Sequence, residues 1–128
     1  MHLKSRLFVP FCCLSLSACI TTGSGDANGP TSALRAEIEK SGLAAGLDPA
    51  ARAKAASAEF EALENGLAGV PVKWNASSAL GEVTPDPAYV IGEMRCRRYK
   101  HVISSGGQTR SGAATACRDA AGRWVPLD

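Results

Sequence analysis

Histidine is almost absent from this 128-residue chain, which contains only His2 and His101. A serine or cysteine nucleophile needs a base, so a catalytic triad would depend on His101, in the middle of a basic segment. We favour the alternative, in which His101 is an ordinary strand residue. With one histidine and two cysteines after the first 19 residues, a zinc site has too few ligands. We therefore expect no catalysis, no metal, no other cofactor and no small-molecule substrate.

Long apolar runs are also missing, and the one near the start, Leu7 to Leu16, is too short for a stable membrane span. It follows Lys4 and Arg6, as in the positively charged start of a secretory signal. Leu16-Ser17-Ala18-Cys19 then resembles the lipobox of bacterial lipoprotein signals. That resemblance implies a signal peptide at residues 1–18 and a diacylglycerol and palmitate lipid on Cys19. The alternative is an ordinary cleaved signal with a chance cysteine.

Cysteine use agrees with export. Cys12 and Cys13 would leave with the signal, and Cys19 would carry the lipid. Cys96 and Cys117 then remain as an even pair in an oxidising compartment, where disulfides persist. Two free, buried thiols are the alternative.

A glycine pair lies between these two cysteines. If Gly106-Gly107 forms a two-residue hairpin turn, the numbers of opposite residues add up to 213, and Cys96 faces Cys117. The two would form a non-hydrogen-bonded pair, where Cα atoms are about 4.5 Å apart, within reach of a disulfide. The sequence therefore predicts a β-hairpin closed by a Cys96–Cys117 disulfide.

The segment before the hairpin predicts a tether and a helix. Residues 19–47 are interpreted as a flexible tether containing one short helix with Leu34 and Ile38 on its apolar side. Asp48-Pro49 then supplies an N-cap and a first-turn proline for an alanine-rich helix. Its acidic residues, Glu59, Glu61 and Glu64, are predicted to form a solvated face.

Residues 48–128 are predicted to form one small α+β domain. An amphipathic helix packs on an antiparallel sheet of four to five strands in a meander, held together by one disulfide. Valine-, tyrosine- and tryptophan-containing runs bounded by glycine and proline mark the strands. These runs are residues 70–74, 82–84 continued by 89–91, 94–104, 109–118 and 123–125.

Charge is unevenly divided along the chain. Residues 19–94 carry 5 basic and 10 acidic side chains, whereas residues 95–128 carry 7 basic and 2 acidic ones. The basic hairpin meets either the chain's own acidic helix or an anionic partner. A third alternative is that the basic residues serve solubility and protect strand edges. Nucleic acid is an unlikely partner for an exported chain. The candidate patch for an anionic partner comprises Arg95, Arg97, Arg98, Lys100 and Arg110.

Several motifs over roughly residues 47–126 resemble the C-terminal domain of the rickettsial-type 17 kDa surface antigen lipoproteins. The motifs are Leu63-Glu64-Asn65, Val70-Pro71-Val72-Lys73-Trp74-Asn75, Gly81-Glu82-Val83-Thr84-Pro85, Tyr89, Cys96-Arg97-Arg98-Tyr99, Gly112, Ala116-Cys117-Arg118 and Gly122-Arg123-Trp124. The chain departs from the family in its glycine zipper, of which only Gly42 to Gly46 remains.

This resemblance implies a non-catalytic outer-membrane lipoprotein of a Gram-negative bacterium, an envelope structural component or surface antigen. Ile20, where an aspartate would retain the protein at the inner membrane, implies sorting to the outer membrane. Its partners would be the outer membrane through the lipid, and an envelope protein or glycan. The alternative function is a binding module, in which the basic hairpin recruits an anionic envelope glycan, lipid or partner protein.

Overall fold

The computed structural model describes residues 29–127, so the expected signal peptide, Cys19 and the first part of the tether lie outside the described residues. The described part contains two helices and one antiparallel sheet, in agreement with the predicted α+β class. The helices are α1 (Ser32–Lys40) and α2 (Pro49–Asn65). The strands are β1 (Val72–Asn75), β2 (Ala79–Pro85), β3 (Tyr89–Ile91), β4 (Met94–Ser105), β5 (Gln108–Arg118) and β6 (Trp124–Pro126).

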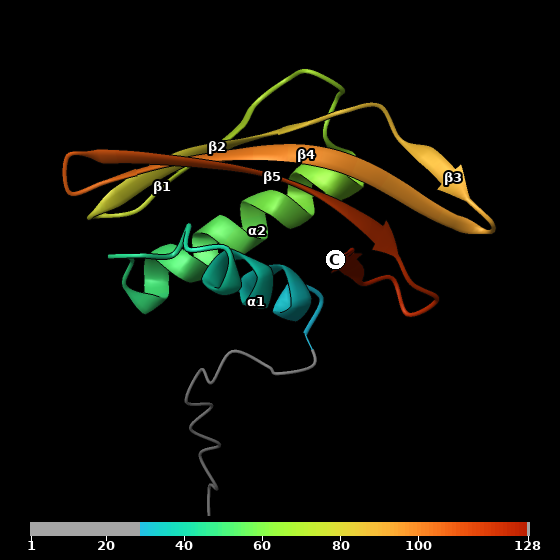
Figure 1. The fold of residues 1–128 in the computed structure, drawn as a ribbon, viewed down its shortest axis with the longest axis horizontal. Coiled ribbons are helices and arrows are strands. Elements are labelled where there is room, and N and C mark those ends of the chain that lie inside the picture. The colour runs from blue at the N-terminus through green and yellow to red at the C-terminus, as the bar shows by residue number, and fades with distance from the viewer. Residues whose placement is uncertain (1–28, 128) are drawn as a thin grey trace, which may run out of the picture.

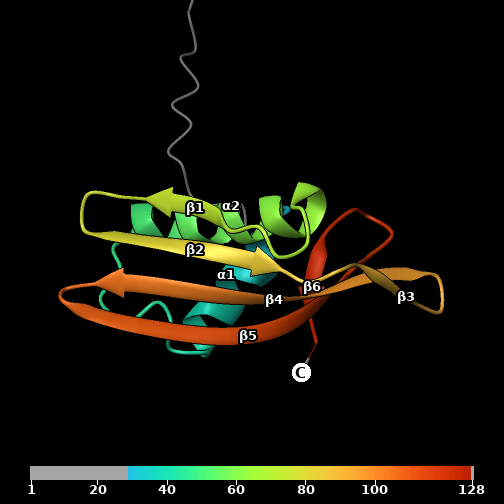
Figure 2. The same cartoon turned by 90° about the horizontal axis from the view of Figure 1, so that it is seen from above.

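The molecule has two layers, with both helices on the same face of the sheet (Figure 1). The strand order is β1-β2-β4-β5-β6, and β3 pairs with β4. The sequence treated β2 and β3 as one strand interrupted by prolines. They are separate strands that follow one another along the same side of β4, as Figure 2 shows from above. The sheet therefore has six strands.

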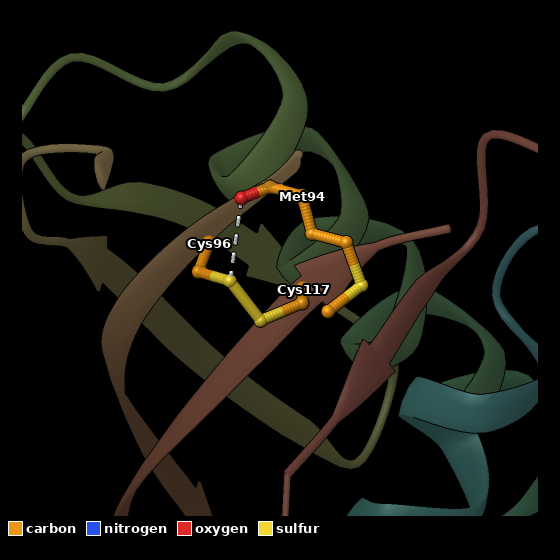
Figure 3. Close-up of a disulfide and its surroundings, with 3 residues drawn as sticks. All are labelled: Met94, Cys96 and Cys117. Carbon is orange, nitrogen blue, oxygen red and sulfur yellow. Dashed lines mark hydrogen bonds between the residues drawn. A yellow bond between two sulfur atoms is a disulfide. The ribbon is translucent and has the colours of Figure 1, made fainter. Parts of the chain in front are cut away.

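The predicted hairpin register is confirmed. Ser105 pairs with Gln108 across the Gly106-Gly107 turn, and Cys96 pairs with Cys117 without any bulge between them. Both turn glycines have positive φ, which glycine adopts without steric cost. The predicted disulfide is also present, with Cα atoms 4.1 Å apart (Figure 3). The Sγ of Cys96 lies 3.8 Å from the carbonyl oxygen of Met94. Because a disulfide sulfur carries no hydrogen, it cannot donate a hydrogen bond to this oxygen.

Helix α2 begins where the sequence predicts. The Asp48 carboxylate accepts a hydrogen bond from the backbone N–H of Ala51 at 2.7 Å, and Pro49 occupies the first turn. Many of its small side chains are buried, which lets the helix backbone approach its neighbours, α1 and the sheet, closely. The buried alanines of this helix are Ala51, Ala55, Ala56, Ala58 and Ala62.

The boundary of the folded part differs from the prediction. Leu34 and Ile38 of α1 are completely buried, and Leu43, Ala44 and Leu47 of the following loop belong to the same core. The packed unit therefore begins near residue 31 and not at residue 48. A helix this short is marginal alone in water, but burial of its apolar side and packing against α2 stabilise it. No helix within residues 29–127 is both long and apolar enough to cross a membrane.

Candidate functional site: a buried polar network between helix and sheet

The most unusual site in the described structure is a set of polar side chains buried between α2 and the sheet. Glu59 is only 2% exposed and His101 is completely buried. The prediction that Glu59 belongs to a solvated face is therefore wrong. His101 is a strand residue whose side chain lies in the core. Polar groups are costly to bury without hydrogen-bond partners. The partners of Glu59 and His101 therefore explain how the core accommodates them.

Every polar atom of this network has a partner. The Oε1 of Glu59 lies 2.7 Å from Nδ1 of His101, and the Tyr99 hydroxyl donates to the Oε2 of Glu59 at 3.2 Å. On the other side of the imidazole, the Trp74 indole N–H donates to Nε2 of His101 at 2.9 Å. The Glu59 carboxyl group thus joins α2 to Tyr99 and His101 of β4. His101 extends the connection to Trp74 of β1.

The indole fixes the protonation state of the histidine. Tryptophan can only donate, so Nε2 of His101 must accept and carries no hydrogen. The hydrogen of the neutral ring then lies on Nδ1 and is donated to Glu59. Because both ring nitrogens are engaged, His101 presents no free nitrogen to a substrate in this arrangement.

The carboxyl and phenol groups respond to the same burial. Burial raises the pKa of Glu59 above 4.5, while the hydrogen bond and charge of His101 and the hydrogen bond from Tyr99 act in the opposite direction. Burial, followed by the charge of Glu59, also raises the pKa of Tyr99 far above its ordinary value. Tyr99 therefore stays protonated and remains a donor to Glu59 throughout the physiological range.

Two glycines give the network its space. Gly81 lies between Trp74 on β1 and Ile103 on β4, and a Cβ on Gly81 would come within 2.6 Å of the indole nitrogen. The indole therefore crosses β2 above Gly81 to reach His101. On the opposite side, Gly112 pairs with His101 and leaves room for Leu43, whose Cδ1 would lie 3.2 Å from a Cβ there.

The cavity beside the network is small. It measures about 30 Å³ and is bordered by Glu59, Tyr99 and His101 together with Glu37 and Ser41 near α1. A volume of this size holds about one water molecule. No group of three or more histidine, cysteine, aspartate or glutamate side chains that could hold a metal occurs within residues 29–127.

Of the predicted basic patch, Arg97 does not lie on the surface. It is 3% exposed, and its guanidinium donates to the carbonyl of Asp86 at 2.9 Å and to those of Ala62, Leu63 and Gly66 at 2.8 to 3.3 Å. Ala62 and Leu63 belong to the last turn of α2, whose final carbonyls run out of partners within the helix, and Gly66 directly follows the helix. Arg97 therefore caps this helix from the sheet and is removed from the candidate patch.

The other four members are dispersed. Arg95 lies over the Trp124 ring at 5.9 Å, on the helix side of the sheet. Arg110 donates to the carbonyl of Ala45 and to Gln108. Only Arg98 and Lys100 share the opposite face of the sheet, because alternate residues of β4 point to opposite sides.

Sequence reasoning missed the network because its members are far apart along the chain. Glu59 and His101 are separated by 42 residues, and Trp74 and His101 by 27. The available signals were a lone histidine on a strand and glycines within strands, which often mark the close approach of another group.

No family model, no curated protein and no solved structure matches this chain.

Proposed function

We propose that this chain is an outer-membrane lipoprotein that serves as a non-catalytic structural or surface-antigen component of the envelope. The Cys96–Cys117 disulfide carries the proposal of export, because such bonds persist in oxidising compartments. The Leu16-Ser17-Ala18-Cys19 motif supports lipidation of Cys19, and Ile20 supports the outer membrane as the destination. The motif resemblance to the 17 kDa surface antigens supports the same assignment.

The polar network supports a structural role for the residues that would otherwise suggest catalysis. His101 is held by Trp74 on one nitrogen and by Glu59 on the other. The adjoining cavity has room for about one water and none for an organic substrate. The network connects the helical layer to the sheet, which is a contribution to stability.

Lipidation is tested with Cys19→Ser in cells labelled with a radioactive fatty acid. We expect the wild-type chain to incorporate label and to fractionate with the outer membrane, and the variant to accumulate as an unlabelled precursor. Blocking the lipoprotein signal peptidase with globomycin should reproduce the precursor. Normal outer-membrane fractionation of an unlabelled variant would contradict the anchor. Protease treatment of intact cells, with a periplasmic control protein, then shows which side the domain faces.

A binding module is the second candidate. Arg98 and Lys100 are exposed side by side on one face, and neither forms an ion pair with another described residue. We expect the Arg98→Gln/Lys100→Gln double variant to lose salt-sensitive binding to envelope fractions. The matched control is Arg35→Gln on α1, which should change nothing. Unchanged binding of the double variant would remove this candidate.

A further inference from the structure

The face of the sheet that points away from both helices, called here the outer face, carries no helix of the described structure (Figure 1). Tyr89, Cys96, Cys117 and Val125 form one row across four strands, because each pairs with the next. Cross-strand partners point to the same face. The disulfide therefore lies on the outer face, where Cys96 and Cys117 are themselves buried and an exposed apolar side chain lies at each end of their row.

The exposed apolar side chains concentrate on this side of the molecule. Nine large apolar residues are exposed within residues 29–127, and strand register places five on the outer face: Leu80, Tyr89, Ile91, Met94 and Val125. Two more, Leu67 and Val70, belong to the loop between α2 and β1, which rises on the same side of the sheet in Figure 1. Tyr89, Ile91, Met94 and Val125 lie near the disulfide, whereas Leu80 lies near the Gly106-Gly107 turn. The cluster beside the disulfide is the candidate interaction surface.

Positive charge accompanies these apolar residues. Lys73 and Glu82 are opposite each other on β1 and β2 and offset one another. Arg98 and Lys100 remain as the charges of β4 on the outer face. The nearby Glu93 lines a groove together with Arg95, Arg118 and Glu64 of α2. Two arginines therefore border the same groove as the Glu93 carboxylate.

We propose that the outer face lies on an anionic phospholipid surface. Apolar side chains at several separate points, with arginine and lysine among them, suit the shallow insertion and headgroup attraction of an interfacial protein. A tyrosine at this level fits the same environment. A glycan would leave the aliphatic side chains exposed to water. A second copy stacked on this face would bring Arg98 and Lys100 close to their own counterparts, which is electrostatically unfavourable.

The proposal rests in part on the proposed lipid anchor. Gly29, the first described residue, is ten positions after Cys19, and a chain of this length reaches at most about 35 Å. An anchored domain would therefore be held within contact distance of the bilayer, so that weak contacts of the outer face become populated.

The test uses the full-length lipidated protein in vesicles of phosphatidylglycerol and phosphatidylcholine. A fluorophore is attached at Ile91→Cys on the outer face or at Ser57→Cys, an exposed position on α2. We expect doxyl-labelled lipid to quench the probe at position 91 at least twofold more than the probe at position 57. The difference in quenching between the two positions should be smaller in vesicles of pure phosphatidylcholine. It should also be smaller when the labelled protein carries Arg98→Gln/Lys100→Gln.

Equal quenching at the two positions would overturn the proposal. Quenching at position 91 that is unchanged in neutral vesicles would also overturn it, because the anionic headgroups would then have no role. Fluorophore self-quenching that increases with the protein-to-lipid ratio, without quenching by doxyl lipid, would assign the face to a second copy instead. Co-flotation with vesicles reports the anchor separately. A chain that does not float but shows the difference at high vesicle concentration would contradict the anchor and support the face.

Discussion

The two faces of β4 show how one basic strand performs two different tasks. On the inner face, Arg97, Tyr99 and His101 are buried, and the side chain of each forms a hydrogen bond with α2. On the outer face, Arg98 and Lys100 are exposed. Adjacent residues of identical chemistry therefore differ completely in role, and strand parity decides which arginine holds the fold and which can meet a partner.

The largest effect is expected when the Glu59 carboxyl group, which holds Tyr99 and His101 on the inner face, is removed. Glu59→Leu removes the acceptor of both His101 and Tyr99 and leaves two buried polar groups without a partner. We expect the free energy of unfolding to fall by about 2–6 kcal/mol, at about 1–3 kcal/mol for each buried donor left unsatisfied. Urea unfolding followed by tryptophan fluorescence measures it. Glu61→Leu on the exposed side of the same helix is the control, with a change within about 0.5 kcal/mol. Equal effects would contradict the buried network.

The next effect concerns the outer face, which is held by a covalent bond. Cys96→Ala/Cys117→Ala removes the cross-link over a sequence separation of 21 residues. The chain-entropy model gives a loss of about 3 kcal/mol for a loop of this size. Comparison of the urea midpoints of the oxidised protein, the reduced protein and the double variant checks it. Reduction should lower the midpoint of the wild type and leave that of the double variant unchanged.

The contrast between neighbours is tested by replacing each arginine in turn. Arg97→Leu removes the guanidinium that donates to Ala62 and Leu63 of α2 and to Gly66 beyond it, and we expect a loss of about 2–3 kcal/mol. Arg98→Leu changes an exposed position and should alter stability by about 0.5 kcal/mol or less. Thermal unfolding of the two variants side by side is the measurement. A larger loss for Arg98→Leu would reverse the assignment of the two faces.

These results indicate which features a sequence alone can predict. The hairpin register followed from local information, since the Gly106-Gly107 turn and the spacing of two cysteines define the pairing. The helix start at Asp48 was likewise local. The buried face of α2 was less accessible, because alanine at many positions gives the helical period little contrast. Ala53 is exposed, whereas Glu59, which the sequence places on a solvated face, is buried.

The candidate site depends on tertiary proximity and could not be predicted in the same way. Glu59 has the sequence context of a surface residue, and only the approach of α2 to Tyr99 and His101 gives it partners. Arg97 and Arg98 are indistinguishable until the sheet is known. Here tertiary contacts override the average preference of charged residues for the surface.

The smallest expected effect is the pH dependence of stability that the buried Glu59 carboxyl causes. Burial raises the pKa of Glu59 above 4.5, and the charge of Glu37 raises it further, against the opposing contributions of His101 and Tyr99. A carboxyl with a higher pKa in the folded chain binds protons more strongly there. Its stabilising contribution is therefore complete below the unfolded pKa and is lost as the pH rises through the folded pKa.

Glu59→Gln keeps an acceptor for His101 and a polar partner for Tyr99 but does not titrate. As the pH rises from about 4, we expect the free energy of unfolding of the wild type to fall relative to that of this variant. The fall is about 1.4 kcal/mol for each unit by which the folded and unfolded pKa values differ. Denaturant titrations of both proteins at several pH values measure it. Glu82→Gln, on the outer face, should follow the wild type, because Glu59 remains the buried carboxyl in that variant. A wild type that instead gains stability relative to Glu59→Gln as the pH rises would show that His101 and Tyr99 outweigh burial at this carboxyl.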